Sequence, residues 1–258
     1  MSAKIFALAT QKGGVGKSTS AIELASILSL EYGYKVLIVD FDGQCNTSMY
    51  LGINKSAISS YDILENNELT KEAIISLKNI DIIPGSTKLS NVSKDYLGDS
   101  SAVFILDDAL TTIKDDYDYI VIDNGPQRDL QMQMVYATAD YIICPTNADE
   151  GGVKGIINVY EDINKLKNAR VPLSNAKIVC ALLTRYKNEN VHKAVWEFLN
   201  SEMNKIDPTI KTFTIPELKE AGEAKLFKKS IIEHAPYTGI SFAYKKVVNE
   251  LLESIKED

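Results

Sequence analysis

The sequence predicts an α/β fold, with a doubly wound, mostly parallel sheet and helices on both faces. Three observations predict it. Apolar, β-branched runs recur along the chain, helical patterns separate most of them, and a glycine-rich loop joins the first run to the first helix. Runs that are apolar at nearly every position are typical of strands buried on both faces, as in parallel sheets.

The expected elements alternate in chain order. The expected strands are residues 4–9, 35–40, 80–84, 119–123, 141–145, 177–183 and 211–215. The first helix is expected at 18–30 and the last at about 242–255. Another helix carries a stripe with helical spacing that we expect to face the core: Val191, Val195, Leu199 and Met203.

Composition limits the class of protein. The 258 residues are 45% hydrophobic and show no linker, which predicts one domain over residues 1–258. The net charge of −7 argues against a chain that coats nucleic acid, so DNA binding would need a local basic patch. Cys45, Cys144 and Cys180 lack metal-ligand spacing and favour a reducing cytoplasm. We expect no signal peptide and no membrane span.

A phosphate-binding loop is predicted between the first strand and the first helix, in the stretch "QKGGVGKST". Its central residues let backbone N–H groups approach phosphate, and the following helix points its positive end there. Lys17 is expected to neutralise the β- and γ-phosphates, and Ser18 to supply a hydroxyl to Mg²⁺. A turn without chemistry is the simpler alternative. The predicted nucleotide contacts are Gly13, Gly14, Val15, Gly16, Lys17, Ser18 and Thr19.

The front of the loop departs from the usual pattern, because Gln11 replaces its first glycine and Lys12 follows. The form KGGxGK[ST] is the deviant Walker A motif, and here the chain resembles the ParA/MinD family of ATPases. The resemblance implies that Lys12 contacts the nucleotide of a partner subunit. A second cation arriving in trans could compensate charge that Lys17 does not reach. The alternative is a solvated loop lysine.

Two aspartates follow the second strand in "VDFDGQCNT", which resembles the family pattern DxDPQGN. The resemblance implies that Asp42 orients the attacking water and that Asp40 lies near Mg²⁺. Gly43 replaces the family's proline and Cys45 its glycine. Gly43 is expected to loosen the loop, because it removes a fixed φ.

A third acidic residue ends the apolar strand in "DYIVIDNGPQ", which has the form of a Walker B motif. Asp123 is therefore expected to hold Mg²⁺, directly or through water. The family usually continues with Ser or Thr and two prolines. Here Asn124 and Gly125 precede Pro126, so only the second proline is kept.

The C-terminal third resembles the family less closely. "TIPELKEA" keeps a proline, Pro216, from a region that abuts the adenine in the family. The candidate DNA-binding residues lie in this third and are diluted by nearby glutamates. They are Arg185, Lys187, Lys219, Lys225, Lys228 and Lys229.

The resemblance implies a slow, Mg²⁺-dependent ATP hydrolase that forms a homodimer around ATP. Such a dimer would bind non-specific DNA, respond to a ParB-like centromere-binding partner, and move plasmid or chromosome DNA in the cytoplasm on the nucleoid. The loop begins at residue 11, so no N-terminal helix-turn-helix is expected. The acidic C-terminus disfavours membrane targeting. Two alternatives stay open: positioning of a protein cargo, and a nucleotide-dependent scaffold with little hydrolysis.

Overall fold

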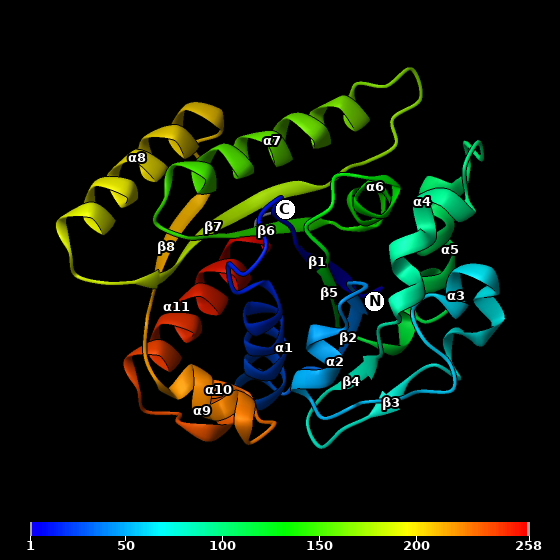
Figure 1. Cartoon of the computed structure of the whole chain (residues 1–258), viewed down its shortest axis with the longest axis horizontal. Coiled ribbons are helices and arrows are strands. Elements are labelled where there is room, and N and C mark those ends of the chain that lie inside the picture. Colours follow the sequence, from blue (N-terminus) through cyan, green and yellow to red (C-terminus); the bar gives the residue numbers. More distant parts are fainter. Residues whose placement is uncertain (1, 257–258) are drawn as a thin grey trace.

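A twisted sheet organises the molecule, and a computed structural model describes it over residues 2–256. The strand order is β3-β4-β2-β5-β1-β6-β7-β8, and every pair is parallel except β3 with β4 (Figure 1). This confirms the predicted doubly wound, mostly parallel sheet. The strands are β1 Lys4–Leu8, β2 Val36–Phe41, β3 Ile75–Ser76, β4 Asp81–Ile83, β5 Tyr119–Asn124, β6 Tyr141–Thr146, β7 Lys177–Tyr186 and β8 Lys211–Pro216.

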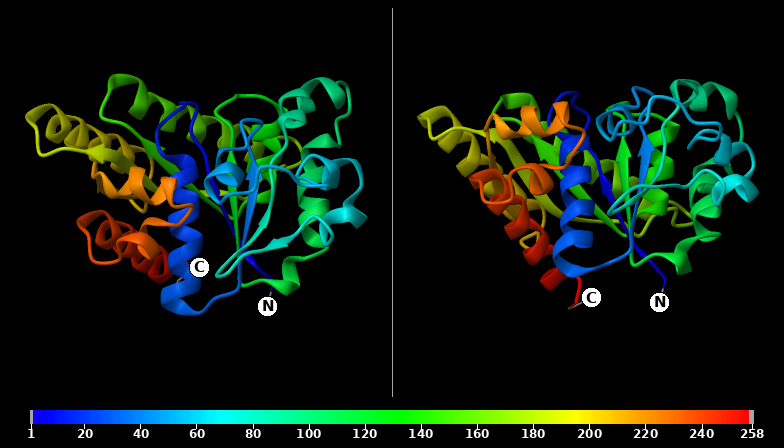
Figure 2. Two further views of the ribbon diagram at one scale, coloured as in Figure 1. Left: turned by 60° about the horizontal axis from the view of Figure 1, so that its bottom comes forward. Right: turned by 90° about the horizontal axis from the view of Figure 1, so that it is seen from below.

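Helices cover both faces of the sheet (Figure 2). Successive residues of β1 alternate between the two cores: Ile5 and Ala7 pack on the face of α3 to α8, and Phe6 and Leu8 on the face of α1, α10 and α11. The helices are α1 Lys17–Tyr32, α2 Asn46–Tyr50, α3 Asp62–Glu65, α4 Val92–Asp95, α5 Ile105–Thr111, α6 Leu130–Thr138, α7 Glu150–Lys167, α8 Asn190–Ile206, α9 Glu220–Leu226, α10 Ile231–His234 and α11 Gly239–Ser254.

The structure differs from the predicted elements by a residue or two at several ends, by three at the start of the last helix, which begins at Gly239, and in the following features. The short antiparallel edge strand β3 was not expected, because two residues carry no readable period. Strand β7 runs three residues further than predicted, to Tyr186. On α8, Leu199 and Met203 are buried as expected, but Val191 is 65% exposed. The prediction for Val191 was wrong, because the first turn of α8 extends past the sheet edge (Figure 1).

The carboxyl ends of the central strands bring the predicted acidic residues together. Asp40 of β2 and Asp123 of β5 are partners in the parallel register. Leu8 ends β1 beside Asp123 on the other side, and the glycine-rich loop follows it. Ligands of doubly wound sheets bind at this edge. None of the helices within residues 2–256 is long and apolar enough to cross a membrane.

Candidate functional site

The glycine-rich loop between β1 and α1 adopts the backbone that its sequence predicts. Gly14 and Gly16 have φ values of 73° and 85°, in the left-handed region that favours glycine. Gly16 is the N-cap of α1 and no side chain caps that helix, so its first N–H groups face the loop. A helix N-terminus open in this way favours an anion.

Hydrogen bonds at two loop residues, Val15 and Gln11, attach the loop to the rest of the fold and were not predicted from the sequence. The Thr184 hydroxyl at the end of β7 lies 2.9 Å from the backbone oxygen of Val15. Gln11 accepts a hydrogen bond from Asn158 at 2.8 Å and donates one to Asp162 at 3.2 Å, both on α7. Gln11 thus anchors the front of the loop to α7.

A cavity of about 350 Å³ opens in front of the loop. Lys17, Ser18 and Asp42 all line it, so the structure brings these predicted residues together. Lys17 is only 7% exposed, and its Nζ lies 3.3 Å from the backbone oxygen of Lys12. Burial lowers the pKa of Lys17, while the charges of Asp123 and Asp42 oppose this shift. The cavity therefore places one buried cation against two carboxylates. Its other lining residues are Gly13, Gly14, Gly16, Thr19, Gln44, Asn46, Tyr50, Pro126, Arg185 and Lys225.

Asp123 has the chemistry of a magnesium ligand. It is fully buried, and its Oδ2 accepts a hydrogen bond from the Thr47 hydroxyl at 2.7 Å. Its Oδ1 is buried without a hydrogen-bond partner in the described structure. Burial raises the pKa of Asp123, which the nearby Ser18 hydroxyl, the Thr47 hydrogen bond and the Lys17 charge counteract. A divalent cation would satisfy the orphaned oxygen and stabilise the ionised carboxylate.

Asp40 is not among the residues that line the cavity. Its Oδ2 accepts hydrogen bonds from the backbone N–H and hydroxyl of Ser48, at 2.8 and 2.6 Å, and its Oδ1 accepts one from the N–H of Asp42 at 3.3 Å. Burial, followed by the charge of Asp123, raises its pKa. Asp40 thus holds the backbone of the loop that carries Asp42, and its place near magnesium stays a prediction.

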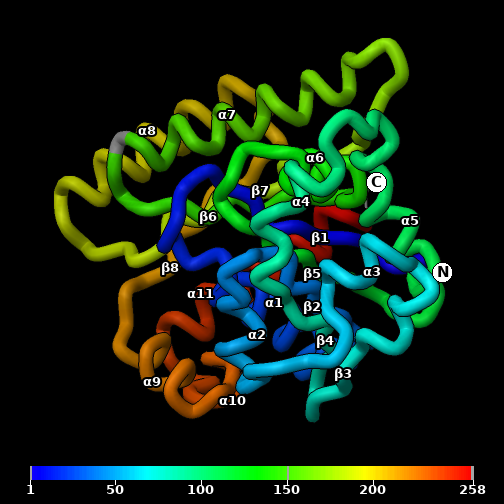
Figure 3. The backbone as a smooth tube through the Cα atoms, turned by 45° about the vertical axis from the view of Figure 1, so that its right-hand side comes forward, coloured from blue at the N-terminus to red at the C-terminus, as the bar shows by residue number. Residues whose placement is uncertain are grey.

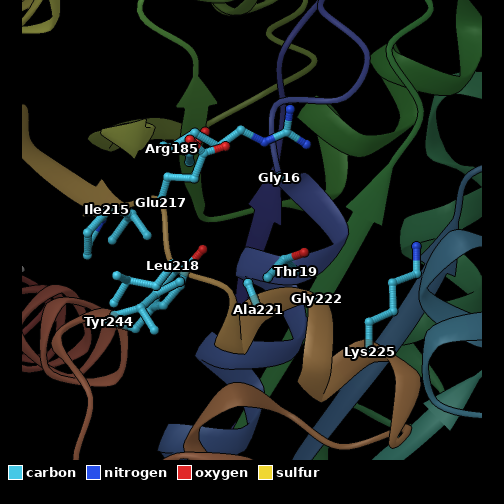
Figure 4. Close-up of a pocket in the computed structure, with 13 residues that line it drawn as sticks. Gly16, Thr19, Arg185, Ile215, Glu217, Leu218, Ala221, Gly222, Lys225 and Tyr244 are labelled. Carbon is cyan, nitrogen blue, oxygen red and sulfur yellow. The ribbon is translucent and has the colours of Figure 1, made fainter. Parts of the chain in front are cut away.

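A second cavity of about 360 Å³ adjoins the first and shares Gly16, Thr19, Arg185 and Lys225 with it (Figure 4). Pro216 lines this cavity, where the sequence predicts an adenine contact. Polar and apolar groups share its remaining wall, in which the side chains of Ile215, Leu218 and Ile240 suit a flat base. The other lining residues are Thr184, Ile215, Glu217, Leu218, Ala221, Gly222, Ile240 and Tyr244.

Comparisons with known proteins agree with this geometry. Residues 3–178 match the profile of a family described as "AAA domain". The chain is 27% identical over 253 residues to the sporulation initiation inhibitor protein Soj of Bacillus subtilis, covering 96% of this chain and 98% of Soj. It is 30% identical to a plasmid partition protein of Borrelia burgdorferi B31 bound to AMPPNP, with a TM-score of 0.79 over 98% of this chain and all of that one. The chain belongs to the ParA/MinD family of partition ATPases.

Another solved structure resembles this chain in its fold only. The apo structure of Cyanothece McdA superposes with a TM-score of 0.85 at 23% identity, over 96% of this chain and 99% of McdA. This likeness shows that the chain and McdA share a fold.

The structure separates the basic residues predicted to bind DNA. Arg185 and Lys225 line both cavities, and Figure 4 shows the Arg185 guanidinium extending toward Gly16. Lys187 pairs with Glu217 at 2.9 Å and Lys219 with Glu223 at 3.2 Å, both at exposed positions. Lys228 and Lys229 line a cavity on another side of the partition ATPase, together with Lys78. None of the three cavities described above is lined by all six predicted cations.

Lys12, at the front of the glycine-rich loop, has a partner within its own chain. Its Nζ forms an ion pair with Asp149, whose other oxygen accepts a hydrogen bond from the N–H of Gly152 at 3.0 Å and caps α7. The pair is part-exposed, which keeps its contribution to stability small. Lys12 can therefore leave Asp149 at modest cost.

The departures from the family's switch loop have local causes. A Cβ on Gly43 would lie 2.3 Å from the Ser90 hydroxyl, so the absence of a side chain lets the segment after β4 approach. Gly125, where the family has proline, lies against Asp42: a Cβ there would be 3.3 Å from its Oδ1. The loop therefore lies close to its neighbours at Gly43 and Gly125, and the loosening expected at Gly43 stays a prediction.

Cys45 occupies the glycine position of the pattern in a left-handed conformation, with φ 51° and ψ 34°. This backbone costs about 1–2 kcal/mol with a side chain, and glycine removes the cost while adding roughly 0.5–1 kcal/mol of unfolded-state entropy. We expect Cys45→Gly to stabilise the protein by about 0.5–1 kcal/mol, or ~2–3 °C in Tm. Thermal melts with Cys45→Ala as the control test this, because alanine keeps the strained backbone. A glycine variant no more stable than the alanine variant would contradict it.

Proposed function

We propose that the chain, acting as one domain over residues 1–258, is an ATP-dependent switch that closes into a dimer around Mg²⁺-ATP and binds DNA only in that state. The observation that carries the proposal is the cavity in which the buried Lys17, Ser18 and Asp42 converge on the loop N–H groups. A triphosphate suits this arrangement, because a buried cation and a helix N-terminus both favour its charge.

Each site residue has a role that its position supports. Lys17 and the N–H groups of residues 13–19 would bind the phosphates, and Pro216 would contact the adenine. Ser18 and Asp123 would hold Mg²⁺, which neutralises phosphate charge when bound. Asp42, 6% exposed and on the cavity wall, would orient the attacking water. Its Oδ1 accepts a hydrogen bond from the N–H of Gln44 at 2.9 Å, which fixes the side chain.

Dimerisation would transfer Lys12 from Asp149 to the nucleotide of the partner subunit. The triphosphate offers more charge than one part-exposed carboxylate, so the exchange is favourable once ATP is bound. Each dimer would double the number of lysines that face one DNA duplex. Affinity for DNA then rises steeply with nucleotide-driven dimerisation. A ParB-like partner would stimulate hydrolysis and release the DNA, so the protein would cycle on the nucleoid.

The test of the proposal is binding of a non-specific duplex by Asp42→Ala protein, with ATP or ADP, across a salt series. We expect binding with ATP only, with log K falling by ~0.9 per phosphate contact for each decade of salt. Equal binding with ATP and ADP would contradict the switch. Lys12→Ala is the control, since it should bind ATP as a monomer and leave DNA unbound.

A protein cargo is the second candidate function, and the placement of the basic residues favours it. Two of the six predicted cations are paired with glutamates, and two line the nucleotide cavities. This leaves Lys228 and Lys229 with Lys78 as the remaining basic group. An ATP dimer that forms without binding DNA at any salt concentration would support this candidate over DNA segregation.

A further inference from the structure

Glu23 is a buried carboxylate on α1 that neither the phosphate site nor the magnesium site uses. It is fully buried, and among the described residues it forms no ion pair. Its Oε1 accepts a hydrogen bond from the backbone N–H of Ile231 at 2.5 Å, and its Oε2 accepts one from Ile232 at 3.0 Å. A buried carboxylate without a cation is costly, so its two backbone bonds need an explanation.

These bonds attach the start of α10 to the helix that begins at the phosphate loop. The N–H groups of Ile231 and Ile232 belong to the first turn, where no intrahelical acceptor exists. The next N–H, of Glu233, is bonded to the Ser230 hydroxyl at 3.3 Å. Glu23 and Ser230 therefore accept the hydrogen bonds of the free N–H groups in the first turn of α10. The two Glu23 bonds join residues that are 208 and 209 positions apart in the chain.

The chain before α10 forms one wall of the cavity predicted to hold the base. Leu218, Ala221, Gly222 and Lys225 line that cavity, on the turn and helix α9 that follow Pro216 (Figure 4). Residues 225–229 are exposed, so α9 has few anchors in the core. Figure 3 shows α9 and α10 at the side of the molecule, beside α11. The wall is thus held at Pro216, at Ala221 and Ala224, and at α10, whose Ile231 and Ile232 are buried in the core and bonded to Glu23.

Two tyrosines connect the surroundings of Glu23 to both cavities. Tyr50 of α2 lines the phosphate cavity, and its buried hydroxyl has no partner in the described structure. Tyr244 of α11 lines the base cavity, and its hydroxyl lies 2.9 Å from that of Ser20 on α1. The Glu23 charge contributes to raising the pKa of both phenols. Burial raises the pKa of Glu23 itself to about 8, with Glu233 the other acidic group that acts on it.

We propose that Glu23 is a positioning residue that fixes the base-binding wall at one distance from the phosphate loop. The proposal rests on the ATP site proposed above. Helix α1 presents Lys17 to phosphate. Six residues later, Glu23 of the same helix binds the start of α10, where the segment that forms the wall of the base cavity ends. Loss of the Glu23 bonds would let this wall move without disturbing the loop. Binding of ATP would then weaken, while binding of the phosphate chain alone would persist.

The experiment compares the affinities of the full chain for Mg²⁺-ATP and for inorganic tripolyphosphate with Mg²⁺, by calorimetry. We expect Glu23→Leu to weaken ATP binding by about 10- to 100-fold, the range for losing two backbone hydrogen bonds. Tripolyphosphate affinity should change by less than about two-fold. Glu23→Gln keeps one acceptor oxygen, so its affinity for ATP should lie between those of the wild-type protein and the leucine variant. This variant preserves the test if the leucine variant does not fold.

Asp140→Asn is the matched control, because Asp140 also accepts a backbone bond, from the N–H of Ile5 at 2.8 Å, remote from both cavities. It should lower Tm and leave both affinities unchanged. Equal losses of ATP and tripolyphosphate binding in folded Glu23 variants would overturn the positioning role, as would unchanged ATP affinity. Failure of the wild-type protein to bind ATP would instead refute the proposed function.

Discussion

Replacing Lys17 with alanine is expected to abolish ATP binding and ATP-dependent dimerisation together. Lys17 is the buried cation of the phosphate cavity, and Asp42 and Asp123 are the charges that act on it. Without it, two carboxylates would face the triphosphate with less compensation. Truncating one partner of a buried charge pair costs about 2–5 kcal/mol, at least roughly 30-fold in affinity. Calorimetry with Mg²⁺-ATP and size-exclusion chromatography measure the two effects.

Lys12→Ala is the matched control for this prediction, since both lysines belong to one loop and only Lys17 is buried. The Lys12 variant should bind ATP as a monomer and fail to dimerise. A Lys17 variant with wild-type ATP affinity would refute the phosphate-loop assignment. A Lys12 variant that dimerises normally with ATP would refute the role of Lys12 in trans.

Replacing Asp42 with alanine is expected to slow ATP hydrolysis by about 10²–10⁴-fold while ATP still binds, the range for a positioned general base. Asp42 lies on the cavity wall with its carboxylate held by the N–H of Gln44. Dimers that cannot hydrolyse ATP should accumulate. Phosphate release measures turnover, and light scattering measures the dimer.

Wild-type turnover sets the scale for this test. If the Asp42 variant hydrolyses ATP at the wild-type rate, Asp42 is not the water-orienting residue. If the wild-type protein binds ATP and dimerises without measurable turnover, the scaffold alternative is favoured. Gln127→Ala is a useful control, because its side chain lies beside Gly125 and near Asp42 without lining the phosphate cavity.

The departures from the family pattern show how far motif reading extends. The substitutions at Gly43 and Cys45 are visible in the sequence, but their consequences are not. The contact of Gly43 with Ser90 depends on a segment that lies 47 residues later along the chain. The left-handed conformation of Cys45 is a property of the loop that the family glycine already implied. The sequence thus predicted where the loop changed, and the fold showed which residues lie against the changed positions.

The sequence by itself determined the parts of this protein that depend on neighbours in the chain. Strand, glycine-rich loop and helix follow one another directly, so Lys17 and Ser18 could be placed from spacing alone. Asp40 and Asp123 were both expected near Mg²⁺ from their motifs, and the parallel register of β2 and β5 makes them partners.

Tertiary structure alone decided which distant groups complete the site. Lys12 meets Asp149 across 137 residues, Thr184 meets Val15 across 169, and Glu23 meets Ile231 across 208. Arg185 and Lys225 read as surface cations in the sequence, yet both line the nucleotide cavities. Such contacts depend on strand order and on how helices pack over the sheet. A local pattern of residues carries no information about either.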